Sequence, residues 1–180
     1  MDFTFALFNS GRIQFTGAQF TGGHLKFMKS RFNGDTVDFT GIHFTGGRMD
    51  FTRASFNFDT VDFTNAHFNG GLLNFTAADF SGALVNFDHA HFLGGEVDFT
   101  NANFKGGTLE FTRANFNGSD VKFTHAHFGN TYADFTEAQF IGGYIDFLKS
   151  TGKCPTGLLE QISNDTLGIA RLSEKWETDS

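Results

Sequence analysis

The residues of this chain best suited to binding chemistry are acidic, and they recur in alternate copies of a twelve-residue repeat unit. One such series reads Gln14, Asp38, Asp62, Asn86, Glu110 and Asp134. If equivalent residues of alternate units lie above one another, the carboxylates form a stripe that could mimic a phosphate backbone or engage a basic protein groove. The alternative is a solvated polar face that keeps the protein soluble. The candidate interaction surface comprises Asp35, Asp38, Asp59, Asp62, Glu110 and Asp134.

Three histidines, His43, His67 and His91, recur in the same way, once in every second unit. Imidazoles stacked one strand spacing apart could bind a transition metal or sense pH. A metal site requires ligands that converge with a fixed geometry, and a flat ladder offers little convergence. We therefore expect no metal ligands and no bound cofactor, and the role of this column stays open.

A threonine series raises a third alternative, an ice-binding surface built on regularly spaced hydroxyls. The series is Thr16, Thr40, Thr64, Thr112 and Thr136. Each expected face offers Asp-x-Thr instead of paired threonine rows, and Asp88 interrupts the array. An ice-binding face is therefore the weaker hypothesis beside an acidic interaction surface.

Catalysis has little support in the sequence. There is no nucleophile with a positioned base, no phosphate-cradling loop and no isolated pair of carboxylates in an apolar segment. The single cysteine, Cys154, follows Lys153 and excludes a disulfide framework. An interior filled with phenylalanine would also leave no cavity for a substrate. We expect a protein that is not an enzyme.

These recurrences originate in a repeat marked by phenylalanine. The chain has 27 Phe among 180 residues, and from Phe3 to Phe147 the Phe residues of the pattern are alternately five and seven apart. The resulting twelve-residue unit has Phe at its third and eighth positions, an apolar residue at the first and mostly Ala at the sixth. This pattern forms two short segments of period two, which is typical of β-strands and not of helices. Such segments bury one face only when successive copies wind and stack.

Two units are expected to complete one coil of the winding. Facing sheets with large side chains between them lie about 10 Å apart, so a twelve-residue coil could not enclose facing Phe residues. Residues 33–56 match residues 57–80 at 15 of 24 positions, whereas residues 33–44 match residues 45–56 at only 5 of 12. We therefore expect two units and four faces per coil, with about six coils over residues 1–147.

The expected coil has a phenylalanine core and glycine corners. Burial of each Phe contributes about 2 to 3 kcal/mol of transfer free energy. Pairs such as Gly46-Gly47 and Gly70-Gly71 mark alternate corners, where glycine permits a positive φ. The predicted core residues are Phe39, Phe44, Phe51, Phe56, Phe63, Phe68, Phe75, Phe80, Phe87, Phe92, Phe99 and Phe104.

The five-residue segments within each unit resemble the pentapeptide repeat pattern. Residues 61–65 (Val-Asp-Phe-Thr-Asn) and 66–70 (Ala-His-Phe-Asn-Gly) have a small or apolar residue, a polar residue and then a central Phe. The resemblance covers roughly residues 1–150 and departs from the simplest pattern by two extra residues in every twelve. Proteins of the pentapeptide repeat family form right-handed quadrilateral β-helices, so the resemblance implies this handedness and four faces. Some members resemble B-form DNA in shape and charge and protect type II topoisomerases such as DNA gyrase.

The two ends of the repeat are expected to differ. Residues 151–180 leave the pattern, and Leu158, Leu159 and Ile162 have the spacing of a short helix. We interpret this segment as a C-terminal cap over the last Phe layer, with a partner-binding arm as the alternative. The N-terminus begins inside the repeat, with an uncovered Phe layer and open strand edges. This arrangement favours a homodimer through the uncapped N-terminal end, or a chain truncated from a longer one.

Composition limits the class of protein and its partners. The chain has 13 Lys and Arg against 20 Asp and Glu, and its net charge of −7 disfavours direct nucleic acid binding and favours basic partners. No apolar run has the length of a transmembrane helix and no signal peptide is visible, so we expect a cytoplasmic protein that does not enter a membrane.

The sequence and the resemblance together predict an all-β, right-handed quadrilateral parallel β-helix over residues 1–150, with a short C-terminal cap over residues 151–180. We predict a non-enzymatic scaffold for protein interaction, and its most specific form is a DNA-mimicking protector or inhibitor of DNA gyrase. The alternatives are a structural solenoid without specific binding and an ice- or metal-binding surface.

Overall fold

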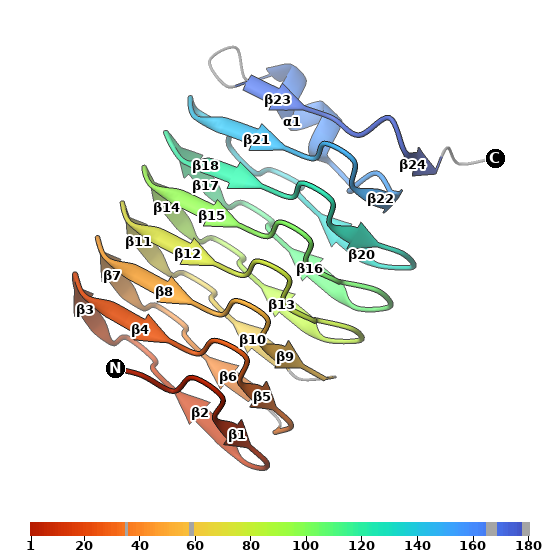
Figure 1. The fold of residues 1–180 in the computed structure, drawn as a ribbon. Helices are drawn as coiled ribbons and strands as arrows, with labels where there is room; N and C mark the ends of the chain where they lie inside the picture. Colours follow the sequence, from red (N-terminus) through yellow and green to blue (C-terminus); the bar gives the residue numbers. More distant parts are fainter. Residues whose placement is uncertain (35, 58–59, 165–168, 178–180) are drawn as a thin grey trace.

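The fold is a rod of stacked coils in a computed structural model that describes residues 1–34, 36–57, 60–164 and 169–177. The chain winds as a right-handed helix, with the N-terminus at one end of the rod and the C-terminal segment at the other (Figure 1). Short parallel strands form the four faces, and the strands of one face stack into a sheet that runs along the rod. The predicted fold class is confirmed.

We number the sheets 1 to 4 in the order in which the chain passes through them from β2 onward. Sheet 1 consists of β2 (Arg12–Gln14), β6 (Thr36–Asp38), β10 (Thr60–Asp62), β13 (Leu84–Asn86), β16 (Thr108–Glu110) and β20 (Tyr132–Asp134). Sheet 2 consists of β3 (Gln19–Thr21), β7 (His43–Thr45), β11 (His67–Asn69), β14 (His91–Leu93) and β17 (Asn115–Asn117).

The other two sheets include strands from the C-terminal segment. Sheet 3 consists of β4 (His24–Lys26), β8 (Arg48–Asp50), β12 (Leu72–Asn74), β15 (Glu96–Asp98), β18 (Asp120–Lys122), β21 (Tyr144–Asp146) and β23 (Ile169–Arg171). Sheet 4 consists of β1 (Leu7–Phe8), β5 (Arg31–Phe32), β9 (Ser55–Phe56), β19 (His127–Phe128), β22 (Thr151–Lys153) and β24 (Trp176–Glu177). Single bridges at Asp79 and Asn103 connect its two halves.

The register of the sheets confirms the coil of two repeat units. Val61 pairs with Val37 on one side and with Val85 on the other, so each strand lies over its counterpart two units away. A coil of a single unit would instead pair Val61 with a residue of the adjacent unit. The face assignments that depend on the longer coil therefore hold.

The core consists of stacked phenylalanine rings, as predicted. Every one of the twelve predicted core residues is at most 4% exposed. Along one column, Phe63 stacks on Phe39 at 4.7 Å and on Phe87 at 4.8 Å between ring centroids. Between columns, Phe63 meets Phe75 edge to face at 6.0 Å. Because these geometries are both favourable for aromatic pairs, one residue type can fill the whole interior.

Glycine pairs occupy the predicted corners between sheets 2 and 3. Gly70 and Gly71 have φ values of +72° and +79°, a region that L-residues with a Cβ rarely adopt. A Cβ on Gly71 would lie 2.7 Å from the carbonyl oxygen of Gly47 in the coil below, so this corner has no room for a side chain.

The C-terminal segment extends the rod and covers its last coil. Helix α1 (Leu158–Asn164) lies at the end where sheet 2 stops, and Leu158 is fully buried. Trp176 packs edge to face on Phe147 at 5.4 Å. Strand β22 pairs with β19, so the parallel sheet continues past residue 150. None of the helices among the described residues has the length and apolarity to cross a bilayer.

Candidate functional site

The acidic series predicted from alternate repeat units does align on sheet 1. Asp62 pairs in register with Asp38 and with Asn86, and Glu110 pairs with Asn86 and Asp134. These side chains therefore form one column on the outside of the rod. The other two candidate residues, Asp35 and Asp59, lie outside the described part of the chain.

Asp38 is not a free carboxylate of this column. Its side chain is buried and pairs with the guanidinium of Arg12, while Thr16 Oγ1 donates to Asp38 Oδ2 at 2.9 Å. Burial by itself would raise the pKa of Asp38, but hydrogen bonds from Thr40, Thr16 and Arg12 outweigh it and lower the pKa. Asp38 therefore joins two neighbouring coils through these buried polar contacts.

Asp62 and Asp134 have a structural role in addition to their charge. The backbone N–H and Oγ1 of Thr64 both donate to Asp62 Oδ1, at 2.9 and 2.6 Å. Thr136 makes the same two bonds to Asp134 Oδ1, at 2.8 and 2.6 Å. Each of these acids therefore closes the corner that follows its strand with one oxygen. The second oxygen of Asp134 accepts from the Tyr132 hydroxyl at 3.0 Å.

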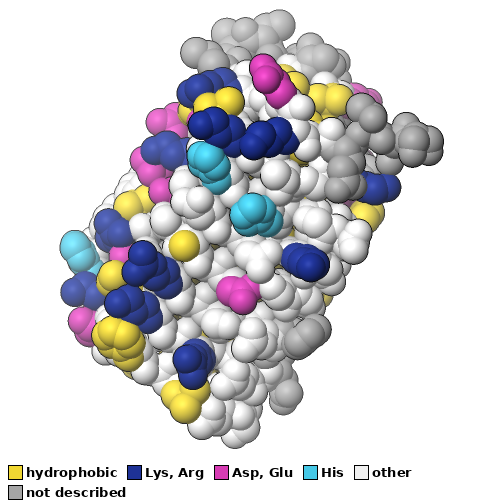
Figure 2. All heavy atoms as spheres, turned by 45° about the vertical axis from the view of Figure 1, so that its right-hand side comes forward, with side chains coloured by type: hydrophobic (Ala, Val, Ile, Leu, Met, Phe, Trp, Pro, Cys, Tyr) yellow, Lys and Arg dark blue, Asp and Glu magenta, His cyan; other side chains and the backbone are white. Residues whose placement is uncertain are grey.

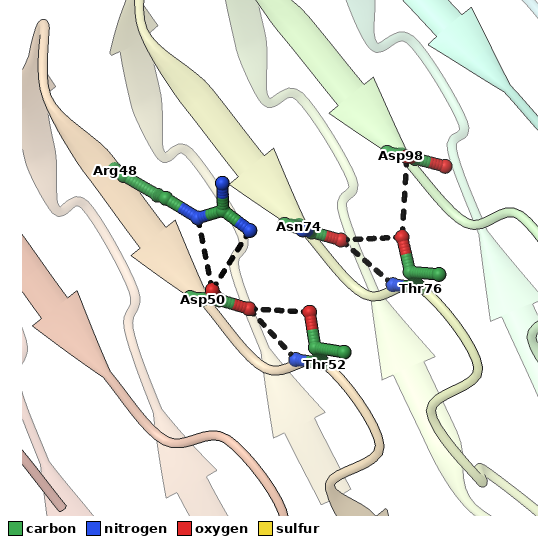
Figure 3. Close-up of polar contacts among 6 residues, drawn as sticks. All are labelled: Arg48, Asp50, Thr52, Asn74, Thr76 and Asp98. Atoms are coloured by element: carbon green, nitrogen blue, oxygen red, sulfur yellow. Dashed lines mark hydrogen bonds and ion pairs between the residues drawn. The ribbon is translucent and has the colours of Figure 1, made fainter. Parts of the chain in front are cut away.

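The same turn recurs on sheet 3, with asparagine in place of aspartate in one coil (Figure 3). Thr52 donates twice to Asp50, and Thr76 donates twice to Asn74. Thr76 Oγ1 also reaches Asp98 Oδ2 in the next coil at 3.1 Å. Because the neutral amide makes the same turn, the turn requires an oxygen acceptor and not a charge.

Glu110 lies at the centre of a group of acids whose negative charge is not fully balanced by cations. Burial raises its pKa, and the nearby carboxylates of Asp88, Asp134 and Asp62 raise it further. We call Asp62, Asp88, Glu110 and Asp134 the acidic cluster. Sequence reasoning missed Asp88 as a member because it treated this position only as a gap in the threonine series.

The edge of the acidic cluster carries compensating groups. Asp88 Oδ2 lies 3.0 Å from His89 Nδ1, while the buried Oδ1 of Asp88 has no hydrogen-bond partner among the described residues. Arg113 forms an ion pair with Glu137 at 2.9 Å. The guanidinium of Arg113 is thus already engaged, and the cluster keeps its negative character.

The three predicted histidines form a ladder on sheet 2. His67 stacks on His43 at 4.7 Å and on His91 at 4.8 Å between ring centroids. Burial lowers the pKa of His67, and the neighbouring imidazoles of His91 and His43 lower it further. The rings lie parallel and do not converge, and no group of three His, Cys, Asp or Glu in the described residues could hold a metal ion.

Three threonines of the column that follows the sheet 1 strands use their hydroxyls within the protein. Thr16 donates to Asp38, and Thr64 and Thr136 donate to the aspartate two residues before each. These hydroxyls close corners or join coils, so their donors are not directed at solvent.

A shallow hollow lies beside Cys154, near the C-terminal end of sheet 1. Its volume is about 290 Å³, and residues 131–133 and 153–156 line it. Burial raises the pKa of the Cys154 thiol, which disfavours the reactive thiolate. The thiol of Cys154 lies 3.7 Å from the carbonyl oxygen of Pro155, to which it donates.

Comparison with known proteins identifies solved structures only. No protein-family model matches the chain, and no curated protein matches it. The chain is similar to HetL, a pentapeptide repeat protein involved in heterocyst differentiation regulation from the cyanobacterium Nostoc sp. strain PCC 7120, with 14% identity and a TM-score of 0.22 over 96% of this chain and 87% of HetL. It is also similar to full-length QnrB1, a plasmid-mediated fluoroquinolone resistance protein, with 19% identity and a TM-score of 0.26 over 92% of this chain and 94% of QnrB1.

The phenylalanine spacing fits the pentapeptide repeat. The two Phe of a unit are five positions apart, and the seven-position step to the next unit is one pentapeptide plus a two-residue corner. The assignment of the fold depends on the strand register and the ring stacking described above.

Proposed function

We propose that this protein is a non-enzymatic interaction module that presents the acidic cluster of sheet 1 to a basic groove of a partner protein. The observation that carries the proposal is the crowding of Asp62, Asp88 and Asp134 around Glu110, whose pKa is raised by burial and further by these carboxylates. Such crowding is relieved when a cationic surface binds, so a basic partner gains more here than at an isolated carboxylate.

A more specific form of the proposal is mimicry of DNA at a type II topoisomerase such as DNA gyrase. It is supported by the resemblance of the repeat to the pentapeptide repeat family and by the alignment of carboxylates along a straight rod. Strand spacing separates successive members of the column by about 4.8 Å. The neutral Asn86 separates Asp62 from Glu110 in this column, and Asp88 adds a carboxylate near Glu110. The resulting line of negative charge from Asp62 to Asp134 is a feature that a DNA-binding groove would accept.

The acidic cluster can be neutralised without loss of the corner turns. Asp62→Asn and Asp134→Asn keep the acceptor oxygen, as Asn74 does on sheet 3, and Glu110→Gln removes the third charge. The matched control is Glu96→Gln with Asp98→Asn and Asp120→Asn on sheet 3, because it changes the net charge equally.

Gyrase supercoiling with and without a quinolone is the direct assay. The wild type should protect or inhibit gyrase at micromolar concentration, the sheet 1 triple variant should lose the effect, and the sheet 3 triple variant should retain it. No effect of the wild type would remove gyrase as the partner. A pull-down from the native host with the same three proteins then tests the broader proposal, which fails if both triple variants recover the same partners as the wild type.

A second copy of the chain is a further proposed partner, through the N-terminal end. The first coil exposes Phe5 to 68% and Leu7 to 56%, and Phe3 and Phe8 are only partly buried. Exposed apolar layers and strand edges favour association. Sedimentation velocity should show a dimer that Leu7→Glu dissociates, and a wild-type monomer at high concentration contradicts this part of the proposal.

A further inference from the structure

Most of the lysines and arginines of this protein fall into two groups, one that forms ion pairs with carboxylates and one that does not. Those on sheets 1 and 3, and at the corner between sheets 1 and 2, form ion pairs with carboxylates. The pairs are Arg12–Asp38, Lys26–Asp2, Arg48–Asp50, Arg113–Glu137, Lys122–Glu96 and Arg171–Asp146.

Six cations on and beside sheet 4, a set that does not include Lys153 of β22, form no such ion pair with the described residues. Each of them is exposed, and none has a carboxylate within ion-pair distance in the described part of the chain. We call this group the basic face. It consists of Lys29, Arg31, Arg53, Lys105, Lys149 and Lys175.

The basic face is visible where the sheet 4 side of the rod comes forward (Figure 2). Lysine and arginine side chains gather there near both ends of the rod, with histidines between them. The acid in the middle of this sheet, Asp79, accepts hydrogen bonds from Ser81 Oγ at 2.6 Å and from Asn103 Nδ2 at 3.2 Å. It neutralises no cation among the described residues, so the face is positive on a protein whose net charge is −7.

We propose that the basic face is a second interaction surface, separate from the acidic cluster, and that it binds an extended acidic polypeptide segment along the rod. Exposed cations without carboxylate partners attract an anionic partner, and the paired cations of the other faces do not. Asn33 and Asn57, exposed directly after β5 and β9, add uncharged groups that can bond a peptide backbone.

The distribution of the cations favours a polypeptide over a nucleic acid. Lys29, Arg31 and Arg53 form one group in the first coils, and Lys149 lies five strand spacings from Lys29, about 24 Å along the rod. Between them, the coil of Asp79 contributes an acid instead of a base. A nucleic acid carries a negative charge at every nucleotide, so its phosphate backbone would have to pass over this acid. An extended peptide of about seven or eight residues covers the same length and can carry its acidic residues at its two ends only.

The binding test uses the whole chain and two matched triple variants. Lys29→Gln, Arg31→Gln and Arg53→Gln neutralise one end of the basic face. Lys26→Gln, Arg113→Gln and Lys122→Gln change the net charge equally but remove cations that are already paired. Circular dichroism confirms that both variants are folded. All four acids of the acidic cluster are retained in both variants, so a negative outcome here leaves the function proposed for sheet 1 open to its own test.

The probe is a fluorescein-labelled peptide of four Glu, four Ser and four Glu, measured by fluorescence anisotropy at 50 mM NaCl. The wild type should bind it, the basic-face variant should bind about tenfold more weakly, and the control variant should stay within about twofold of the wild type. Raising NaCl to 300 mM should weaken wild-type binding, since exposed charges are screened.

Three results would overturn the proposal. The first is no detectable peptide binding by the wild type, and the second is an equal loss in the control variant. The third is tighter binding of a fluorescein-labelled single-stranded DNA of fifteen nucleotides than of the peptide, which would assign the face to nucleic acid.

Discussion

Thr52 Oγ1 donates a hydrogen bond to Oδ1 of Asp50 at 2.6 Å, and the backbone N–H of Thr52 donates to the same oxygen at 2.9 Å. The next residue, Arg53, has a φ of +57° although it is not glycine. The aspartate thus holds the chain in a left-handed turn between two faces, at a corner where the sequence provides no glycine. This bond pair explains why Asp or Asn precedes the central Phe and why Thr follows it.

Removal of the threonine hydroxyl should therefore weaken the corner. We expect Thr52→Val to lower the free energy of unfolding by about 1 kcal/mol, since a hydrogen bond to a charged acceptor is lost while the shape is kept. Thr60→Val on sheet 1 is the control, because its hydroxyl has no hydrogen-bond partner among the described residues. Urea denaturation followed by circular dichroism measures both, and equal effects would show that the hydroxyl bond from Thr52 to Asp50 contributes nothing.

The architecture could be predicted because the residues that determine it recur in every repeat unit. Phe at two fixed positions and an apolar residue at the first set the inward side chains, and the similarity between alternate units set the coil. The register of Val37, Val61 and Val85 follows from these features alone. The corners at Arg53 and its equivalents were not predicted, although the Asp-x-Thr pattern that forms them was present and was interpreted as a charged stripe.

The candidate site could be predicted only as an alignment. The repeat placed Asp38 and Asp62 in one column, but the pairing of Asp38 with Arg12 depends on how a side chain from the neighbouring column bends across a coil. Asp88 likewise reaches Glu110 from a different position of the repeat. Contacts of this kind depend on rotamers, which a periodic pattern does not specify.

Glu110→Gln should stabilise the fold at neutral pH. The pKa of Glu110 is raised in the fold, so this carboxyl favours folding most below its unfolded pKa of about 4.3 and least once the pH has risen through the folded pKa. We expect a gain of about 0.5 kcal/mol at pH 7 that vanishes near pH 3.5. Thermal melts at both pH values test this, with Glu96→Gln as the control that breaks an ion pair with Lys122. A loss of stability at pH 7 would contradict the proposed crowding.

His67 should make the fold sensitive to mild acid. Its pKa is lowered in the fold, so its contribution is complete above the unfolded pKa of about 6.5 and is lost as the pH falls through the folded value. His67→Gln should reduce the loss of stability between pH 7.5 and pH 5 by about 0.5 kcal/mol. Gln139 occupies the same column, so the substitution suits the position. His24→Gln, on sheet 3 and outside the ladder, is the control, and an identical pH profile in both variants would exclude the ladder as the cause.

Phe87 should be among the most sensitive positions of the core. It is fully buried, and its ring lies 4.8 Å from both Phe63 and Phe111. Phe87→Ala should cost about 3 to 5 kcal/mol, because the neighbouring coils cannot collapse into the cavity. Phe8→Ala, in the partly exposed first coil, should cost less. Urea denaturation distinguishes the two. A greater loss of unfolding free energy in the Phe8 variant would show that the first coil contributes more to stability than the buried coils do.

The glycine corner provides the sharpest test of how closely the coils stack. Gly70 and Gly71 both have a positive φ, so alanine at either position is strained, at about 1 kcal/mol. The two differ in their surroundings. A Cβ on Gly70 would meet nothing within 4 Å, whereas one on Gly71 would lie 2.7 Å from the carbonyl oxygen of Gly47 and 2.8 Å from the carbonyl carbon of Gly46. That contact is with backbone and cannot be relieved by a change of rotamer.

Gly71→Ala should therefore destabilise the rod by at least about 2 kcal/mol more than Gly70→Ala, because the clash can be relieved only if two coils move apart and weaken the sheet hydrogen bonds between them. The same contrast is expected one coil further on, where Gly95 is crowded by Gly71 and Gly94 is open. Urea denaturation of the four single variants measures it. If the two members of a pair lose the same stability, the backbone strain alone is sufficient and the close approach of the coils is not what requires glycine at this corner.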